Sequence, residues 1–271
     1  MKKKIIVTGG DGMVGSQVKF GIRLSKRQLN ILSKASIEKA LAKYKPEVVL
    51  HLGAITDMLK CEENPKEAFK INVLGTQNIA QACKQHKIKL VYMSTCAVFD
   101  GKKKTAYKES DTPRPFNIYG ETKLKGEKIV QKITPDALII RTGWLFGSTE
   151  FKNKFINSIV LRLKKNKELD VTYDRYGSPT YIPDLLGSIQ SLIIKKETGI
   201  YHIVNSGIAS YFEISKEAKK IGKFKTKLNK VRAQDIENLK VTRSRNEALV
   251  SSKIKLRSWK KAIKEYIEHS S

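Results

Sequence analysis

Short apolar segments alternate with helical segments through the first half of this 271-residue chain. Apolar runs occupy residues 4–8, 20–24, 47–52, 90–93 and 137–142. Helical patterns occupy residues 33–44 and 64–86, and a later helix carries residues 119–123. Parallel strands that are covered on both faces have such near-continuous apolar runs, and helices connect them. The alternation therefore predicts an α/β fold with a doubly wound parallel sheet of the Rossmann type.

A glycine-rich turn, Thr8-Gly9-Gly10-Asp11-Gly12, follows the first predicted strand, and helical potential resumes at residues 13–18 around Gly15. A pyrophosphate approaches the backbone closely only where no Cβ intervenes, and a helix N-terminus attracts its negative charge. The position between a strand and a helix is the context that this function requires. We predict a dinucleotide site here, with an ordinary glycine turn as the alternative.

The second predicted strand ends in Ser25-Lys26-Arg27, where many dinucleotide-binding folds carry an acidic residue for the ribose hydroxyls. A cationic pair suits a 2′-phosphate instead, so NADPH is favoured as the cofactor and NADH is the alternative. Lys26 and Arg27 could also simply extend the basic surface of the protein.

Tyr119 and Lys123 are four residues apart, which places them on the same face of a helix. A tyrosine, with an unperturbed pKa of about 10, is a poor acid near neutral pH, and a nearby ammonium favours its phenolate form. Thr95 follows the predicted strand 90–93 directly. Because ligands bind at the carboxyl ends of parallel strands, these side chains are expected at the same edge of the sheet.

The chain carries 53 Lys and Arg against 26 Asp and Glu, a net charge of +27. A nucleic-acid surface would explain this charge, but the lysines are spread along the chain and no helix-turn-helix, RNP or zinc-finger pattern is present. We therefore expect an anionic small-molecule ligand and no nucleic-acid partner. The three cysteines and four histidines lack ligand spacing, so no metal site is expected.

No apolar run approaches the roughly 20 residues that span a bilayer. The basic start, Met1 to Lys4, is followed by only a short apolar run before the glycine turn, unlike a signal peptide. We expect a cytoplasmic protein without a membrane partner.

Sequence motifs extend over nearly the whole chain in a characteristic order. They are residues 8–15 (TGGDGMVG), 54–57 (AITD), 71–76 (INVLGT), 94–101 (STCAVFDG), 119–123 (YGETK), 141–147 (RTGWLFG), 174–180 (DRYGSPT), 184–185 (DL) and 199–205 (GIYHIVN). With these motifs the chain resembles the extended short-chain dehydrogenase/reductase family, and within it the dTDP-4-dehydrorhamnose reductases.

The resemblance implies a catalytic set of Thr95, Tyr119 and Lys123. Trp144 matches an aromatic residue that such reductases place against the sugar, and Cys96 lies next to the bound sugar. Together with the cationic segment after the second strand, the predicted cofactor contacts are Gly9, Gly12, Met13, Val14, Ser25, Lys26, Asn30, Ile31, Gly53, Ala54, Ile55, Asn72, Tyr119 and Lys123.

The second half of the chain is expected to form a smaller α/β substrate-binding lobe, residues 148–271, after a dinucleotide-binding domain of residues 1–147 to which parts of 174–205 return. Helices are expected at 154–164, 183–195 and 211–221, and the basic segment 223–247 is expected to be irregular. Arg243 and Arg245 could clamp a nucleotide diphosphate, because guanidinium groups match phosphate oxygens; two solvated arginines are the alternative.

These features predict NADPH-dependent reduction of a nucleotide-linked 4-keto-6-deoxy sugar, in deoxysugar and cell-surface polysaccharide biosynthesis. Cys96 and Ala97 replace the Asp-Tyr pair that is usual after Ser-Thr in the family, which leaves the identity of the sugar open. Two alternatives remain: a nucleotide-sugar epimerase or dehydratase, and a non-catalytic NADP-binding regulatory subunit. A homodimer is also left open.

Overall fold

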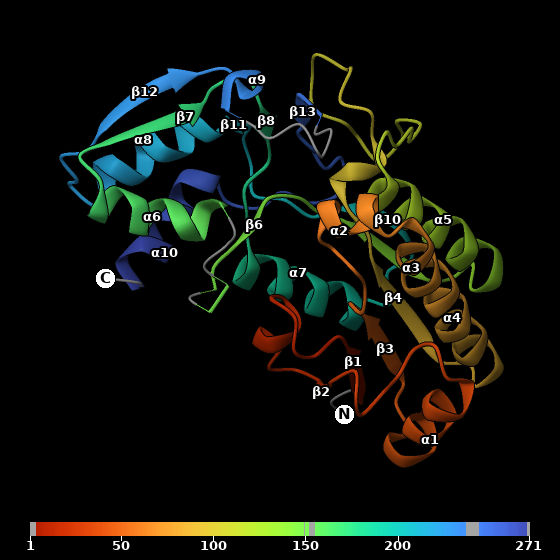
Figure 1. Cartoon of the computed structure of the whole chain (residues 1–271). Coiled ribbons are helices and arrows are strands. Elements are labelled where there is room, and N and C mark those ends of the chain that lie inside the picture. The colour runs from red at the N-terminus through yellow and green to blue at the C-terminus, as the bar shows by residue number, and fades with distance from the viewer. Residues whose placement is uncertain (1–3, 149, 152–154, 237–243, 270–271) are drawn as a thin grey trace. The chain divides into compact units, whose positions relative to one another are not determined.

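The computed structural model of the protein describes residues 4–148, 150–151, 155–236 and 244–269. The chain divides into two compact units (Figure 1). The first consists of residues 1–98, 113–141 and 189–201, and the second of residues 99–112, 142–188 and 202–271. The chain therefore passes between the units several times, whereas the predicted division has one main cut after residue 147.

The first unit contains a central sheet with the strand order β10-β5-β4-β3-β1-β2. Its strands are β1 (Ile5–Thr8), β2 (Ile22–Leu24), β3 (Val48–His51), β4 (Lys89–Met93), β5 (Leu138–Arg141) and β10 (Gly199–His202). Its helices are α1 (Lys34–Tyr44), α2 (Met58–Glu63), α3 (Pro65–Phe69), α4 (Thr76–Gln85) and α5 (Ile118–Ile133), with a π-helical segment η2 (Lys70–Gly75) between α3 and α4. Two short 3-10 turns are η1 (Gly15–Gln17) and η3 (Cys96–Val98).

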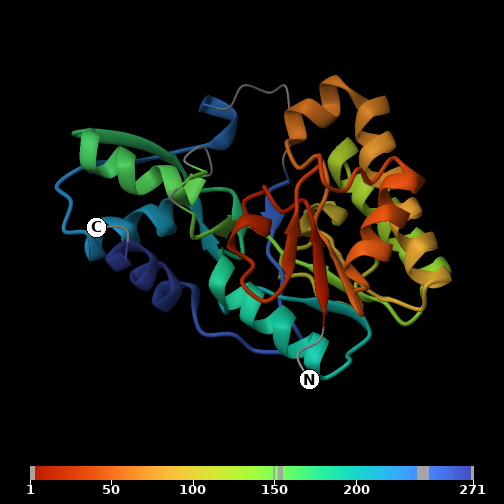
Figure 2. The ribbon, with the colours of Figure 1, turned by 90° about the horizontal axis from the view of Figure 1, so that it is seen from below.

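The sheet is doubly wound. Strand β1 pairs in parallel with β2 on one side and with β3 on the other, and β4 and β5 continue in parallel beyond β3. Residues of α1, α4 and α5 form one hydrophobic core with the strands, so these helices cover the same face (Figure 2). The predicted Rossmann-type α/β fold is confirmed, and its topological switch point lies between β1 and β3.

The helix expected after the glycine turn is a single 3-10 turn, η1, and the chain is extended again at Val18. The early start of the second strand predicted a brief helix at this point, and the structure has one of three residues. Few residues connect the turn to β2, and an extended chain covers about 3.3 Å per residue against about 1.5 Å for a helix. An early return to extended backbone therefore lets so short a segment reach the start of β2.

The second unit combines short strands with helices. Its elements are β6 (Leu145–Phe146), α6 (Phe155–Lys165), β7 (Glu168–Thr172), β8 (Tyr176–Gly177), β9 (Thr180–Tyr181), the start of α7 (Ile182–Ile194), β11 (Ala209–Ser210), α8 (Tyr211–Ile221), β12 (Lys227–Val231), α9 (Ala233–Ile236), β13 (Asn246–Glu247) and α10 (Trp259–His269). The segment expected to be irregular contains β12, which pairs in parallel with β7. Its lysines obscured the strand pattern, in which Leu228 packs against the core.

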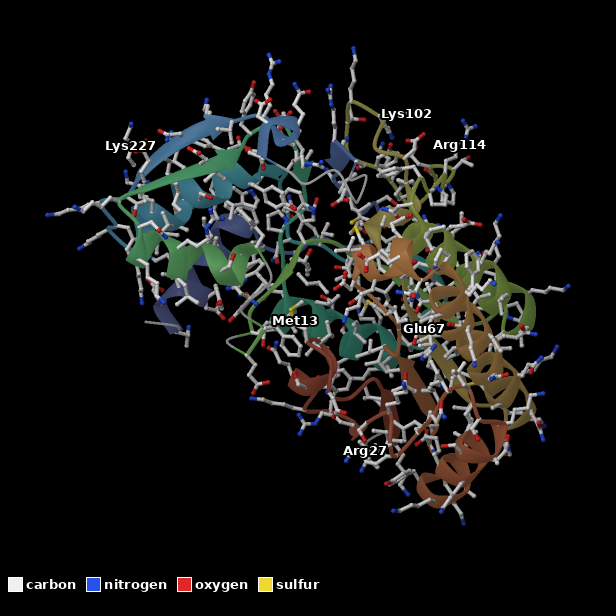
Figure 3. All side chains as sticks on the ribbon, in the orientation of Figure 1. Met13, Arg27, Glu67, Lys102, Arg114 and Lys227 are labelled. Atoms are coloured by element: carbon white, nitrogen blue, oxygen red, sulfur yellow. The ribbon has the colours of Figure 1, made fainter. Side chains whose placement is uncertain are left out.

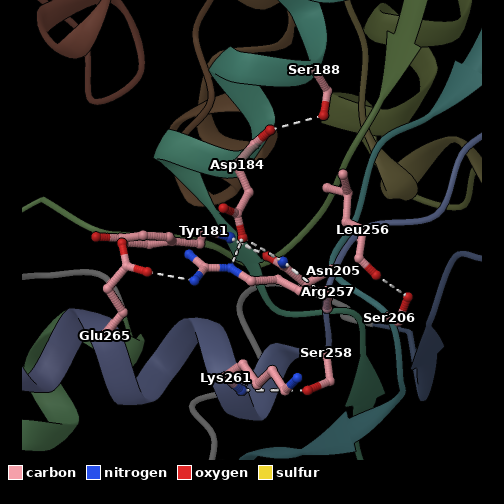
Figure 4. A network of polar contacts seen from close by, with 10 residues as sticks. All are labelled: Tyr181, Asp184, Ser188, Asn205, Ser206, Leu256, Arg257, Ser258, Lys261 and Glu265. Carbon is pink, nitrogen blue, oxygen red and sulfur yellow. Dashed lines mark hydrogen bonds and ion pairs between the residues drawn. The ribbon is translucent and has the colours of Figure 1, made fainter.

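A polar network joins the first turn of α7 to α10 in the second unit (Figure 4). Asp184 accepts hydrogen bonds from Arg257 Nε at 2.8 Å and from Asn205 Nδ2 at 2.7 Å. Arg257 also pairs with Glu265 on α10, and the amide of Tyr181 donates to Asn205 Oδ1 at 2.8 Å. These bonds hold the Asp184-Leu185 motif in place and give Asp184 a structural role.

Candidate active site

The loops that follow β1 and β3 meet at the switch point. Gly9 has a φ of +68°, and a Cβ there would lie 2.9 Å from the amide nitrogen of Gly53. Thr8 Oγ1 accepts hydrogen bonds from the amides of Leu52 and Gly53 at 3.1 and 3.0 Å. A side chain at residue 9 would therefore separate the two loops, which explains the glycine.

The glycine turn is closed on one side and open on the other. A Cβ at Gly15 would come within 3.0 Å of the backbone of Gly9 and Gly10, so the turn is tightly closed on that side. A Cβ at Gly12 would meet only the carbonyl oxygen of Gly9, at 3.2 Å, and Gly12 is otherwise exposed. The open side at Gly12, beside Met13 and Val14, fits a phosphate group. Because η1 is so short, backbone amides and nearby cations have to replace the expected helix dipole.

A hollow beyond the end of β2 is lined by residues that were predicted to contact the adenosine half of the cofactor. It is lined by Asp11, Ser25, Lys26, Arg27 and Asn30. The two cations are exposed there, and Arg27 lies at the edge of the first unit (Figure 3). The charge of this hollow fits an added phosphate. Ile31, which was also expected near the adenine, packs its side chain against Gly75 of η2.

Asn72 lies in the π-helical segment η2 and clamps the loop after β3. Its Oδ1 accepts a hydrogen bond from the amide of Ile55 at 2.8 Å, and its Nδ2 donates to the carbonyl of Ile55 and to Thr122 Oγ1, both at 3.0 Å. Asn72 thereby fixes the backbone of residues 53–55 relative to α5. These bonds support an indirect role in cofactor binding; the direct contact expected of Asn72 stays a prediction.

Ala97 in η3 contacts both Thr95 and Tyr119. The Ala97 amide donates to Thr95 Oγ1 at 3.2 Å, and the Ala97 side chain packs in one buried cluster with Tyr119. The contact depends on Gly120, where a Cβ would come within 3.0 Å of the Ala97 carbonyl carbon. Asn117 caps the helix by accepting a hydrogen bond from the Gly120 amide at 2.7 Å, which fixes the first turn of α5.

Lys123 lies one turn later on α5 and is buried. Its Nζ is 4.1 Å from the ring centroid of Tyr92, whose hydroxyl donates to the Lys123 carbonyl at 3.4 Å. Burial lowers the pKa of Lys123 to about 7, although the negative charge of Glu127 acts in the opposite direction. The amine of Lys123 therefore titrates near neutral pH.

A buried ion pair lies beneath this lysine. Arg141 donates to both oxygens of Glu127, from Nε at 2.9 Å and from Nη2 at 2.7 Å, and Ser94 also donates to this carboxylate. On the other side, burial and the charge of Lys123 lower the pKa of His51 to about 3. His51 is therefore neutral, and it hydrogen-bonds Thr8 Oγ1 at 2.7 Å and Thr76 Oγ1 at 3.2 Å.

Sequence reasoning did not identify Tyr92, Gly120, Glu127 or Arg141 as parts of this site. One signal was present: Glu127 is four residues after Lys123, which puts the two side chains on one helix face. The contacts of Tyr92 and Arg141 come from neighbouring strands, so their spacing in the chain carries no comparable signal.

The predicted substrate residues divide between the units. Cys96 is buried in the first unit. Trp144 and Arg245 belong to the second unit, where Arg245 lines a depression of about 740 Å³ together with Lys102, Lys103, Lys104 and Arg232. Arg243 lies outside the described residues. Across the described ranges, no group of three or more His, Cys, Asp and Glu could hold a metal ion, and no helix has both the length and the apolar character to cross a membrane.

Comparisons with known proteins place the chain among sugar-nucleotide reductases. The family described as RmlD substrate binding domain matches residues 2–271. The chain is 31% identical to the spore coat polysaccharide biosynthesis protein SpsK of Bacillus subtilis (99% of this chain and 98% of the relative). It is 33% identical to the dTDP-4-dehydrorhamnose reductase of Aggregatibacter actinomycetemcomitans (78% and 76%).

Solved structures agree with these relatives. The dTDP-4-dehydrorhamnose reductase of Bacillus anthracis, determined in complex with NADP, superposes with a TM-score of 0.93 at 28% identity and covers 99% of this chain and 100% of its own. The reductase of Yersinia enterocolitica gives 0.90 at 32% identity (98% and 99%). The UDP-glucose 4-epimerase of Thermotoga maritima, at 16% identity and a TM-score of 0.82, shares the fold. The chain thus belongs to the dTDP-4-dehydrorhamnose reductase family.

Proposed function

We propose that this protein is an NADPH-dependent reductase of a nucleotide-linked 4-keto-6-deoxy sugar, in deoxysugar and cell-surface polysaccharide biosynthesis. The observation that carries the proposal is the pair of contacts made by Ala97, whose amide donates to Thr95 Oγ1 and whose side chain packs with Tyr119, while Lys123 lies one turn further along α5. A hydroxyl, a phenol and an amine thus lie in the unit that carries the glycine turn. These three groups can orient a carbonyl group and protonate its oxygen during reduction.

Residues of the chain orient the carbonyl oxygen of the substrate and supply the proton. Thr95 donates a hydrogen bond to the oxygen and orients it, and Tyr119 donates the proton that the developing oxyanion takes up. The ammonium of Lys123 stabilises the phenolate that remains and binds the nicotinamide ribose. The nicotinamide supplies the hydride when it is bound.

The hollow beyond β2 supports NADPH as the cofactor, because Lys26 and Arg27 offer two cations to the 2′-phosphate. The predicted contacts of Gly9, Gly12, Met13 and Val14 with the pyrophosphate are supported by the open side of the glycine turn.

For the substrate, the second unit offers charge and an aromatic surface. Arg245, Arg232 and Lys102–Lys104 line the depression described above, and Tyr176 and Ile208 add apolar surface to it. We propose that this depression holds the nucleotide diphosphate, and that Trp144 contacts the sugar. A cytoplasmic location remains a prediction from the sequence, and a homodimer remains open.

The test is the substitution Tyr119→Phe, which removes the proton donor and keeps the ring. We expect NADPH oxidation with dTDP-4-dehydrorhamnose to fall by about 100- to 10,000-fold, while NADPH binding, measured by fluorescence titration, is unchanged. Tyr44→Phe, on α1 in the same unit, is the matched control and should keep full activity. Full activity of Tyr119→Phe would refute the assignment of the proton donor.

The same assay separates the alternatives. An epimerase or dehydratase restores its cofactor in each cycle, so oxidation of one NADPH for each sugar reduced excludes both. A regulatory subunit would bind NADPH but turn over none of a panel of nucleotide-linked 4-keto sugars. The Cys96-Ala97 departure makes the panel necessary, because the preferred sugar can differ from that of the relatives.

A further inference from the structure

Trp144 is held in an unusual backbone conformation. Its φ is +44°, in the left-handed region that bulky residues rarely adopt. Backbone of this kind persists where the surroundings hold it in place, and it is concentrated at functional sites. The contacts of the Trp144 side chain must therefore stabilise this backbone conformation.

Two neighbours pack against the indole of Trp144. Tyr211 stacks on it, with ring centroids 4.2 Å apart and an interplanar angle of 10°. Gly177 in β8 lies so close that a Cβ there would come within 3.0 Å of the indole ring. The stacked rings of Trp144 and Tyr211 are too close for the backbone of Gly177 to lie between them. Gly177 therefore contacts the indole at a different place from Tyr211. Packing on these two sides leaves little freedom for the ring.

The third contact is a charged hydrogen bond. The indole Nε1 of Trp144 donates to Glu247 Oε2 at 2.6 Å, and Glu247 is only 9% exposed. Hydrogen bonds to a carboxylate are short and about twice as strong as those between neutral groups. Burying a carboxylate costs desolvation free energy. The hydrogen bond itself needs only an acceptor oxygen, which a glutamine side chain also carries.

Strand β13 connects this contact to the cationic depression. Glu247 stands opposite Gly177, and Asn246 stands opposite Tyr176, in the register of β13 with β8. Successive side chains of a strand point to opposite faces. Asn246 lines the depression, and Glu247 bonds the indole from the other face of the strand.

We infer that Glu247 is a positioning residue that fixes the orientation of the Trp144 indole and thereby sets the affinity of the site for the sugar. The inference rests on the proposed function, in which Trp144 contacts the sugar. Gly177 and Tyr211 pack against the indole, and Glu247 accepts the hydrogen bond of its Nε1.

The test compares Glu247→Ala with Glu247→Gln. We expect Glu247→Ala to raise the KM for dTDP-4-dehydrorhamnose about tenfold, from the loss of a hydrogen bond to a charged group, with the KM for NADPH unchanged. Glu247→Gln keeps an acceptor oxygen and should restore most of the affinity. A purely structural role would lower the amount of folded protein and leave both KM values unchanged. Glu197→Ala is the matched control, because Glu197 accepts a 2.6 Å bond from the hydroxyl of Tyr201 in the other unit.

A second measurement does not depend on turnover. In a Trp259→Phe background, which leaves Trp144 as the single tryptophan, Glu247→Ala should shift the emission maximum and increase the mobility of the indole, seen as lower fluorescence anisotropy. Unchanged emission and anisotropy, or equal rises of both KM values, would overturn the inference. If the wild-type protein reduces no 4-keto sugar, the proposed function fails, and the fluorescence comparison still decides whether Glu247 fixes the indole.

Discussion

The charge of Lys123 depends on three buried neighbours. Burial lowers its pKa to about 7, and Glu127 opposes that shift. Arg141 pairs with both oxygens of Glu127, which reduces the charge that Glu127 presents to the lysine. The ring of Tyr92 supports the ammonium at 4.1 Å. Lys123 is thus poised to change its protonation state near neutral pH, a property that the spacing of Tyr119 and Lys123 alone does not predict.

This arrangement gives Lys123 a measurable effect on stability. Its pKa is 10.5 in the unfolded chain and about 7 in the folded one. Between these values the unfolded state binds more protons, so the free energy of unfolding rises with pH, by about 1.4 kcal/mol for each unit of pKa difference. Below pH 7 both states are protonated and the full cost of the buried charge is present.

We therefore expect Lys123→Met to be more stable than the wild-type protein at pH 6, and the difference to shrink as the pH rises towards 10. Urea unfolding at several pH values measures it. Lys125→Met, on the same helix but with a half-exposed side chain, is the control and should show no such trend. A stability difference that does not change with pH would show that Lys123 is charged in both states.

At the scale of elements, the site depends on the close approach of α5 to the sheet. Gly120 faces the backbone of Ala97, and Gly126 faces the ring and hydroxyl of Tyr92, so that a Cβ at either position would come within 3.0 Å of these atoms. The helix can therefore lie directly against η3 and β4. This contact brings Tyr119 to Ala97 and Lys123 to the face of Tyr92.

Gly120→Ala tests this contact. Alanine is favoured over glycine in a helix by about 1 kcal/mol, but overpacking against a backbone costs about 1–3 kcal/mol. We expect a net loss of stability, together with a loss of activity as Tyr119 moves away from η3. Gly187→Ala in α7 is the matched control, because its Cβ would meet nothing within 4 Å and it should be neutral or stabilising. Thermal unfolding and NADPH oxidation measure the two effects, and a stabilised, fully active Gly120→Ala would contradict the close packing.

The elements also show what the sequence can predict. The strand and helix alternation of residues 4–142 predicted the doubly wound sheet, because apolar runs and helix caps are local signals. Ser33, for example, caps α1 by accepting a hydrogen bond from the amide of Ser36. Strand β12 was missed, because it forms by pairing with the distant strand β7. The roles of Thr95, Tyr119 and Lys123 came from family resemblance and remain proposals.

At the scale of the whole molecule, the net charge of +27 is in keeping with the anionic ligands of the proposed reaction. NADPH and a nucleotide-diphosphate sugar are both polyanions. Exposed cations are found in both units, among them Arg27 in the first and Lys102 and Lys227 in the second (Figure 3). A positive surface raises the local concentration of such ligands and speeds their encounter with the protein.

This charge predicts that kcat/KM falls as salt is added, because the screening length shrinks from about 30 Å at 0.01 M to about 10 Å at 0.1 M ionic strength. The value of kcat should change little, since saturating substrate removes the encounter step from the rate. Sucrose at matched osmolarity is the control and should leave kcat/KM unchanged apart from viscosity. Steady-state rates over this salt range measure both parameters. An equal fall in kcat would point to a salt effect on the catalytic residues. A constant kcat/KM would show that the surplus of lysines has no role in capturing ligands.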